Sequence, residues 1–198
     1  KLLLSSAGPR EGKTSTSVNV AASMATSGTK VLLIDTDLRR PRIHRVFDMT
    51  NDRGLSNLVL EPEKPLDQVV QVSDVENLDI LCSGPIPPNP AELLHSPSFN
   101  RVMERLLERY DRIILDSPPV CVVTDALILG NQCDGAIIVV RAGETSREMV
   151  RKAKRLLEDV KITVLGALLN NVDVSRRAYG QYYHPYYRKH GTYYAEDP

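Results

Sequence analysis

The residues best suited to chemistry lie near the start of the chain. Residues 7–14 read AGPREGKT, between a short apolar run and a segment with helical spacing. Backbone N–H groups of such a loop, together with the positive end of the dipole of the following helix, form a binding site for anions. In this pattern, called Walker A, the lysine reaches the β- and γ-phosphates of a nucleotide and the next hydroxyl ligates Mg²⁺. Lys13 and Thr14 are therefore candidates for binding Mg²⁺ and a nucleoside triphosphate.

Two apolar runs further along the chain end in carboxylates. Residues 31–34 lead into Asp35 and Asp37, and residues 113–115 lead into Asp116. Residues two apart on extended backbone share a face, so Asp35 and Asp37 can converge on one ion or water. An apolar strand that ends in one aspartate is the Walker B pattern. Each aspartate alone is consistent with an ordinary capped loop, whereas the combination with the phosphate loop favours Mg²⁺ chemistry.

Strands and helices must bring these residues together. Short runs rich in Val, Ile and Leu predict buried strands at residues 2–4, 31–34, 78–81, 113–115, 136–140 and 164–169. Helical spacing predicts helices at residues 14–26, 99–109, 125–131 and 146–159. This alternation predicts a parallel sheet with right-handed crossovers, and such sheets bind ligands at the carboxyl ends of their strands. The proline-rich residues 84–90 and 117–119 are predicted to be loops.

The predicted fold class is therefore α/β, a P-loop NTPase with a mostly parallel central sheet flanked by helices. The length of 198 residues fits a single domain. Apolar periodicity stops near residue 173, so we expect a domain over residues 1–172 and a flexible tail over residues 173–198. The chain opens inside an apolar run without an initiator Met, so we expect that upstream sequence is missing.

Composition argues against several classes of protein. The 25 Lys and Arg residues balance the 25 Asp and Glu residues, so the overall charge gives no case for a nucleic-acid partner. Cys82, Cys121 and Cys133 are an odd number without C-x-x-C spacing, which argues against both a disulfide framework and a zinc site. No apolar run approaches the ~18 residues of a membrane-spanning helix. We therefore expect this piece to be soluble.

The phosphate loop and carboxylates leave an ATPase switch, a GTPase and a kinase open. Residues 170–173 read NNVD, which is weakly similar to the guanine-binding motif N-K-x-D and has Asn171 in place of the lysine. We interpret this segment as a loop near the nucleotide base and include Asn170 among the candidate binding residues. Motifs elsewhere in the chain must separate the three classes.

Those motifs resemble the bacterial tyrosine kinases, the cytoplasmic domains that accompany capsule and exopolysaccharide export. The resemblance covers nearly the whole chain, and DTDLRRP at residues 35–41 matches the family's second acidic motif, Walker A′. The other matching segments are GLS at 54–56, SGPIPPNPAELL at 83–94, LDSPP at 115–119 and TDA at 124–126. Cell-division and partition ATPases have a similar fold and are the alternative. They carry a signature lysine five positions before the Walker lysine, where this chain has Gly8.

The resemblance implies roles for the site residues. Lys13, Mg²⁺ and Arg39 are the candidates for stabilising charge on the transferring phosphoryl group. Asp35 or Asp37 is the candidate base for the attacking phenol, and Asp116 holds the metal through water. The predicted catalytic residues are Lys13, Asp35, Asp37, Arg39 and Asp116. The predicted metal ligands are Thr14, Asp35 and Asp116. The predicted ATP-binding residues are Gly8, Pro9, Arg10, Glu11, Gly12, Lys13, Thr14, Ser15 and Asn170.

Three basic residues in these motifs have alternative interpretations. The family usually has glycine at the position of Arg10, so a positive φ angle there would strain the arginine. A contact between Arg10 and phosphate is the other interpretation. Arg39 and Arg40 are equally consistent with solvated surface cations, and this interpretation is favoured for Arg40.

Tyrosines gather at the end of the chain. Seven of the eight fall within sixteen residues, among Gly, His, Arg and Lys neighbours that are too polar for a core. A sticky tail for nucleic acid or a protein partner is the alternative, because Arg and Tyr stack on bases. By resemblance the cluster is the autophosphorylation substrate, and the nine residues between positions 170 and 179 reach at most ~30 Å. The predicted acceptors are Tyr179, Tyr182, Tyr183, Tyr186, Tyr187, Tyr193 and Tyr194.

The resemblance also implies partners. Tails of neighbouring subunits are the expected substrates, which requires a homo-oligomer in the full-length form. The family's oligomer helix lies upstream of the P-loop and is absent from this chain, so we expect the piece alone to be monomeric or weakly associated. A membrane activator, fused or separate, would place the domain at the inner face of the cell membrane. The resulting prediction is an ATP-dependent protein-tyrosine autokinase that regulates polysaccharide export.

Overall fold

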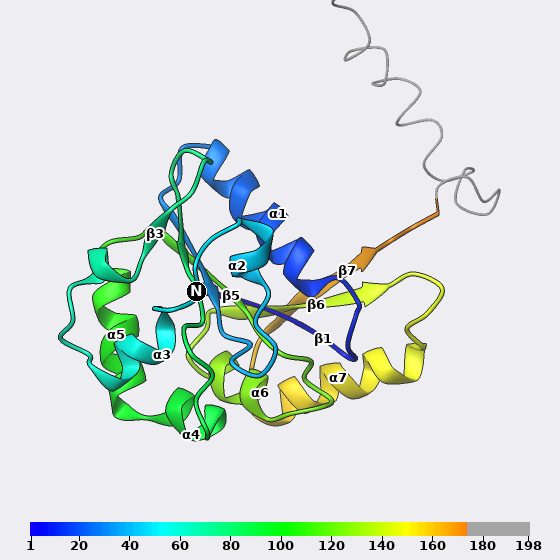
Figure 1. Ribbon diagram of the computed structural model, residues 1–198. Coiled ribbons are helices and arrows are strands. Elements are labelled where there is room, and N and C mark those ends of the chain that lie inside the picture. Colours follow the sequence, from blue (N-terminus) through cyan, green and yellow to red (C-terminus); the bar gives the residue numbers. More distant parts are fainter. Residues whose placement is uncertain (174–198) are drawn as a thin grey trace, which may run out of the picture.

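The computed structural model describes residues 1–173, so all but the first residue of the predicted tail, and all seven of its tyrosines, lie outside this range. Seven strands form one sheet in the order β3-β4-β2-β5-β1-β6-β7 (Figure 1). All neighbouring strands are parallel except β3, which pairs antiparallel with β4. The strands are β1 (Leu2–Ser6), β2 (Val31–Asp35), β3 (Gln71–Val72), β4 (Leu78–Leu81), β5 (Arg112–Asp116), β6 (Gly135–Arg141) and β7 (Val164–Asn170).

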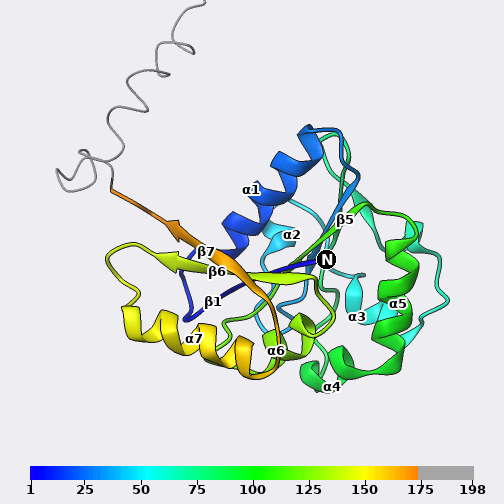
Figure 2. The ribbon, with the colours of Figure 1, turned by 180° about the vertical axis from the view of Figure 1, so that it is seen from behind.

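Helices cover both faces of the sheet, and each face has its own apolar core (Figures 1 and 2). Successive strand residues point to opposite faces. Leu3 accordingly packs in the larger core beneath α3 to α7, and Leu4 packs in the smaller core beneath α1 and α2. The helices are α1 (Lys13–Thr26), α2 (Ile43–Val46), α3 (Leu55–Leu60), a 3-10 turn η1 (Leu66–Gln68), α4 (Pro90–His95), α5 (Pro97–Leu107), α6 (Asp125–Gly130) and α7 (Arg147–Asp159).

The structure confirms the predicted fold class, the six predicted strands and the four predicted helices. The elements missed by sequence reasoning are short: α2, α3, η1, β3 and α4. The prediction that residues 84–90 are all loop is wrong at its last residue, because α4 begins at Pro90. Proline is tolerated at the first helical position, where its missing N–H has no partner to lose.

The topology brings the predicted site to one sheet edge. Strands β1 and β2 both flank β5, and Leu4 and Asp35 are each in register with Asp116. The carboxyl ends of these three parallel strands therefore meet where residues 7–12 turn into α1. In the part of the chain that the structure describes, none of the helices has the length and apolar character needed to cross a membrane.

Gly54 and Gly84 lie where the start of α3 and the chain that follows β4 approach each other closely. A Cβ atom added at Gly54 would lie 2.2 Å from the Cys82 carbonyl oxygen and 2.3 Å from the Gly84 nitrogen. The Leu55 and Ser56 N–H groups in turn donate to the Cys82 and Ser83 carbonyls. The start of α3 thus binds directly to the chain that leaves β4, and only glycine allows backbones to approach so closely.

We predict that Gly54→Ala lowers the free energy of unfolding by roughly 2 kcal/mol or more, because backbone atoms must move to admit the methyl group. Denaturant unfolding measures this loss. The matched control is Gly166→Ala, since an added Cβ there meets nothing within 4 Å. Equal stability of the two variants would contradict the close approach.

Candidate active site

The phosphate loop is the turn between β1 and α1. Gly12 precedes the helix with φ of 88°, and Arg10 has φ of 64°. The position of Arg10 therefore does require the left-handed region, where a non-glycine residue costs on the order of 1 kcal/mol or more. Its side chain lines the phosphate pocket. The structure thus combines the positive φ expected to strain Arg10 with a position at the pocket.

The loop is held in shape by Glu11, which is almost fully buried. The Ala7 N–H donates to one carboxylate oxygen of Glu11 at 2.9 Å, and the Thr145 hydroxyl donates to the other at 2.8 Å. From β7, the Asn170 side-chain amide donates to the Glu11 carbonyl at 3.1 Å. A Cβ atom added at Gly12 would lie 1.9 Å from this amide nitrogen. Asn170 therefore braces the loop and is not among the residues that line the phosphate pocket.

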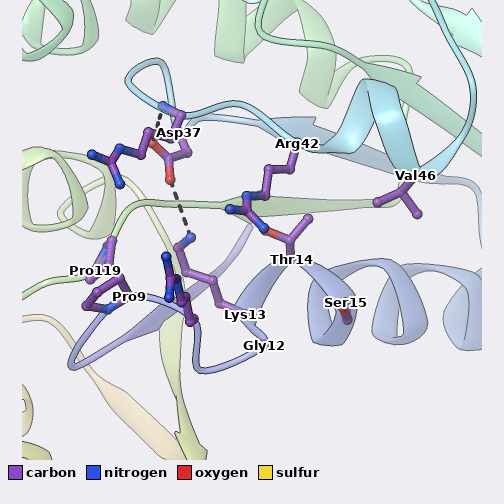
Figure 3. Close-up of a pocket in the computed structure, with 11 residues that line it drawn as sticks. Pro9, Gly12, Lys13, Thr14, Ser15, Asp37, Arg42, Val46 and Pro119 are labelled. Carbon is purple, nitrogen blue, oxygen red and sulfur yellow. Dashed lines mark hydrogen bonds and ion pairs between the residues drawn. The ribbon is translucent and has the colours of Figure 1, made fainter.

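The pocket itself has a volume of about 370 Å³ and opens between the phosphate loop, the chain after β2 and Pro119. Figure 3 shows Lys13 and Asp37 facing each other across it, with the Lys13 Nζ 3.3 Å from an Asp37 carboxylate oxygen. Both side chains are largely buried, and Asp37 also accepts the Arg40 N–H at 3.0 Å. The residues that line the pocket are Pro9, Arg10, Gly12, Lys13, Thr14, Ser15, Asp37, Arg40, Arg42, Val46 and Pro119.

Asp35 lies behind this pocket and does not line it. Its carboxylate accepts the N–H groups of Arg42 and Ile43, each at 2.9 Å, and that of Asp37 at 3.2 Å. Burial, and then the negative charge of Asp116, raise the pKa of Asp35 to about 7 despite these hydrogen bonds. Asp35 therefore holds the start of α2 to the end of β2, and Asp37 alone of this pair faces the pocket.

Asp116 is buried beneath the start of α1. The Ser17 hydroxyl donates to it at 3.0 Å, which connects β5 to α1. Burial raises its pKa to about 6, while the charge of Lys13 and hydrogen bonds from Thr14 and Ser17 act in the opposite direction. The predicted ligands Thr14 and Asp116 are therefore neighbours.

The arginines are arranged differently from the sequence prediction. The Arg39 guanidinium donates two hydrogen bonds, of 2.8 and 3.0 Å, to the buried carboxylate of Asp125 at the start of α6. Arg39 does not line the pocket, whereas Arg42 does. Arg40 is exposed, as expected of a surface cation, and it also lines the pocket. Sequence reasoning missed Arg42, Val46 and Pro119. The only signal for Arg42 was its place in a basic run directly after the two carboxylates.

The donors near the phosphate loop fit Mg²⁺. No group of three or more His, Cys, Asp or Glu side chains within residues 1–173 is arranged to hold a metal ion. The hydroxyl of Thr14 and the carboxylate of Asp116 instead offer a sparse pair of oxygen donors. Mg²⁺ suits such a set, because it keeps several waters and takes phosphate oxygens as its other ligands. The oxygens of Asp35, already bonded to backbone N–H groups, are the least suited of the predicted ligands.

Comparison with known proteins gives close relatives. Residues 10–167 match the family model described as an AAA domain. The chain is 43% identical to tyrosine-protein kinase YwqD of Bacillus subtilis over 182 residues, 91% of this chain and 76% of that protein. The kinase domain of the Escherichia coli tyrosine kinase ETK has a TM-score of 0.81 and 35% identity, covering 86% of this chain and 67% of that one. The septum site-determining protein MinD of Pyrococcus horikoshii, complexed with Mg-ADP, has a TM-score of 0.71, and the match covers 91% of this chain and 75% of that one. Its identity of 22% shows a common fold alone.

The raised pKa of Asp35 predicts a pH-dependent stability of the nucleotide-free chain. Between the ordinary carboxyl pKa near ~4 and the folded value, the folded state retains a proton that the unfolded state has released, so the stability from Asp35 is lost as pH rises. Asp35→Asn removes this loss. Denaturant unfolding gives the free energy of unfolding of the variant relative to that of the wild type. We expect this difference to shift in favour of the variant by on the order of 1 kcal/mol or more between pH 5 and pH 8.

Asp52→Asn, at an exposed loop residue, controls for the removal of one negative charge. A difference between wild type and Asp35→Asn that stays constant with pH would contradict the assignment of a raised pKa to Asp35.

Proposed function

The chain belongs to the bacterial tyrosine kinases, and from this premise we propose that it transfers the γ-phosphoryl group of ATP to tyrosines of its own C-terminal segment. The observation that carries the proposal is the pair of Lys13 and Asp37, a cation and a carboxylate that face each other in the phosphate pocket at 3.3 Å. Lys13 can bind phosphate, and Asp37 can accept a proton. The acceptors would be the seven tyrosines at residues 179–194, which follow the last strand of the sheet.

Lys13 must change partner during the reaction. In the absence of nucleotide its ammonium group is paired with Asp37, which neutralises two largely buried charges. Phosphate oxygens that enter the pocket replace Asp37 as the partner of Lys13. This exchange separates the Asp37 carboxylate from its lysine partner when ATP is in place, so that its oxygens can contact the acceptor phenol.

Asp37 is the residue that we assign as the base. The phenol of tyrosine has a pKa of ~10 and attacks poorly at neutral pH. As the phenolic oxygen bonds to the γ-phosphorus, the bond to the oxygen of the β-phosphate breaks, ADP leaves, and the phenolic proton passes to Asp37. Asp37 suits this role better than Asp35, because Asp37 lines the pocket and Asp35 is bonded to three backbone N–H groups.

Positive charge around the pocket stabilises the transferring group. Arg40 and Arg42 line the pocket with Lys13, and their backbone N–H groups are fixed by Asp37 and Asp35. Arg39, which directly precedes Arg40, is bonded to Asp125 and anchors this segment to the start of α6. Mg²⁺, which Thr14 and Asp116 would hold, supplies further positive charge on the phosphates. Fixed positive charge accounts for most of the catalysis that phosphoryl transfer requires.

The proposal extends to the assembly. A segment that begins beside the carboxyl edge of the sheet can enter the pocket of a neighbouring subunit, so we propose transfer in trans within a homo-oligomer. The domain would act at the inner face of the cell membrane with a membrane activator, and phosphorylation would regulate capsule or exopolysaccharide synthesis and export. These finer points follow from the family resemblance.

We predict that Lys13→Met and Asp37→Asn each lower tail phosphorylation by roughly a hundredfold or more, since one loses phosphate binding and the other the base. The purified chain is incubated with Mg-ATP, alone and with the cytoplasmic segment of its membrane activator, and residues 174–198 are analysed by site-resolved mass spectrometry. Lys154→Met, in an exposed ion pair on α7, is the matched control. ATP hydrolysis without phosphotyrosine under both conditions would instead favour a partition-type ATPase.

Arg42 provides a separate test of the pocket. Arg42→Ala keeps the N–H donor to Asp35 and removes the side chain beyond Cβ, with its guanidinium, so we expect a loss of roughly tenfold or more in phosphorylation rate with little change in stability. Arg45→Ala, on the same short helix but outside the pocket, is the control. Equal rates for the two variants would remove Arg42 from the site.

A further inference from the structure

A second groove is lined by the end of β6 and the loop that follows it, by helix α7 and by the edge strand β7, which lie at the same side of the molecule in Figure 2. We propose that this groove binds phosphotyrosine of the chain's own C-terminal segment once the transfer has taken place. The inference rests on the proposed function for the source of the phosphotyrosine. We call the site the arginine groove and define it by Arg141, Arg147, Arg151, Val150, Ala167 and Leu169.

The groove combines free positive charge with an apolar wall. Arg147 and Arg151 are one helical turn apart on α7, so they share a face. Both are exposed, and within residues 1–173 neither forms an ion pair, whereas neighbouring Arg141 and Lys154 are paired with glutamates. The opposite wall is Leu169 of β7, whose side chain is 46% exposed. The groove thus places an exposed leucine beside two arginines that have no ion-pair partner within residues 1–173.

Phosphotyrosine has the shape and charge that such a groove accepts. The groove has a volume of about 500 Å³, enough for an aromatic ring and its phosphate. Leu169, Val150 and Ala167 offer apolar contacts for the ring. Arg147 and Arg151 can each donate paired hydrogen bonds to phosphate oxygens, the geometry by which guanidinium groups select phosphate.

Charge makes the binding depend on phosphorylation. Residues 174–198 contain four Arg and Lys side chains against two Asp and Glu side chains, so the unmodified segment is basic. The arginine groove repels it. Each phosphate adds about −1.5 to −2 charge, so the first two modifications already make the segment acidic. Repulsion thus changes to attraction at the same step that creates the phosphate ligand.

The segment also begins next to the groove. Strand β7 ends at Asn170, and the preceding residue, Leu169, is part of the groove wall. Six residues from Asp173 to Tyr179 span at most ~20 Å. Arg141 links the two sites, because its guanidinium donates to the Arg10 carbonyl of the phosphate loop at 3.2 Å. A modified tyrosine that leaves the phosphate pocket can therefore be held beside it, and the pocket becomes free for the next acceptor.

The test is direct binding of synthetic peptides to the full chain carrying Lys13→Met, so that its own tail stays unmodified. Fluorescence anisotropy follows a labelled peptide of residues 179–190, either unmodified or phosphorylated at Tyr182 and Tyr183. We expect the phosphopeptide to bind at least about tenfold more tightly, and Arg147→Gln with Arg151→Gln to weaken it by about tenfold or more. Excess ADP should leave the binding unchanged, since the nucleotide pocket is a different site.

The matched control is Lys154→Gln with Arg155→Gln, which removes the same charge from the same helix outside the groove. An equal loss in both double variants, binding of both peptides alike, or displacement by ADP would each overturn the proposal. A further outcome is that Arg147 and Arg151 are needed to bind vesicles of phosphatidylcholine with about a quarter phosphatidylserine but not to bind the phosphopeptide. This outcome would assign the groove to the membrane surface instead. Because the phosphopeptide is synthetic, these results are independent of whether the chain makes phosphotyrosine in the kinase assay.

Discussion

Three carboxylates crowd one buried edge of the sheet, and the need to offset their negative charge is the constraint on which the rest of the site depends. Lys13 pairs with Asp37, hydroxyl groups donate to Asp116, and three backbone N–H groups donate to Asp35. Even so, burial raises the pKa of both Asp35 and Asp116. The carboxylates of Asp35 and Asp116 are thus held in place at a cost in electrostatic free energy, which a divalent cation bound nearby would reduce.

The same constraint explains why neighbouring residues have different roles. Strand β2 ends at Asp35, and the hydrogen bonds of Asp35 shape the backbone of residues 35–43, which carries Asp37 and Arg42 into the pocket. Arg39, bonded to Asp125, ties that backbone to the start of α6. The residues that would act on the phosphoryl group are thus held by residues that never touch it. Such support is what an electrostatic site requires in order to be preorganised.

Sequence reasoning located the sheet, the phosphate loop and the family, and the relatives confirm the family. Buried parallel strands and a Walker A loop can be recognised from short stretches of sequence alone. The region of residues 43–95 was largely missed, because its helices are too short to show a period and are interrupted by Gly and Pro. The roles of Arg39 and Arg42 could not be predicted either. Which arginine faces the pocket depends on the hydrogen bonds of Asp35 and on Asp125, a residue far along the chain.

The central claim, phosphoryl transfer from this pocket to the tyrosines of another copy, is tested most directly by mixing two chains. The donor has Lys13 and lacks residues 174–198, and the acceptor is nitrogen-15-labelled, carries Lys13→Met and keeps its tail. With Mg-ATP and the activator segment, our account predicts phosphotyrosine on the labelled tail, and none when the donor also carries Lys13→Met. Consumption of ATP with no phosphotyrosine on the labelled chain would contradict it.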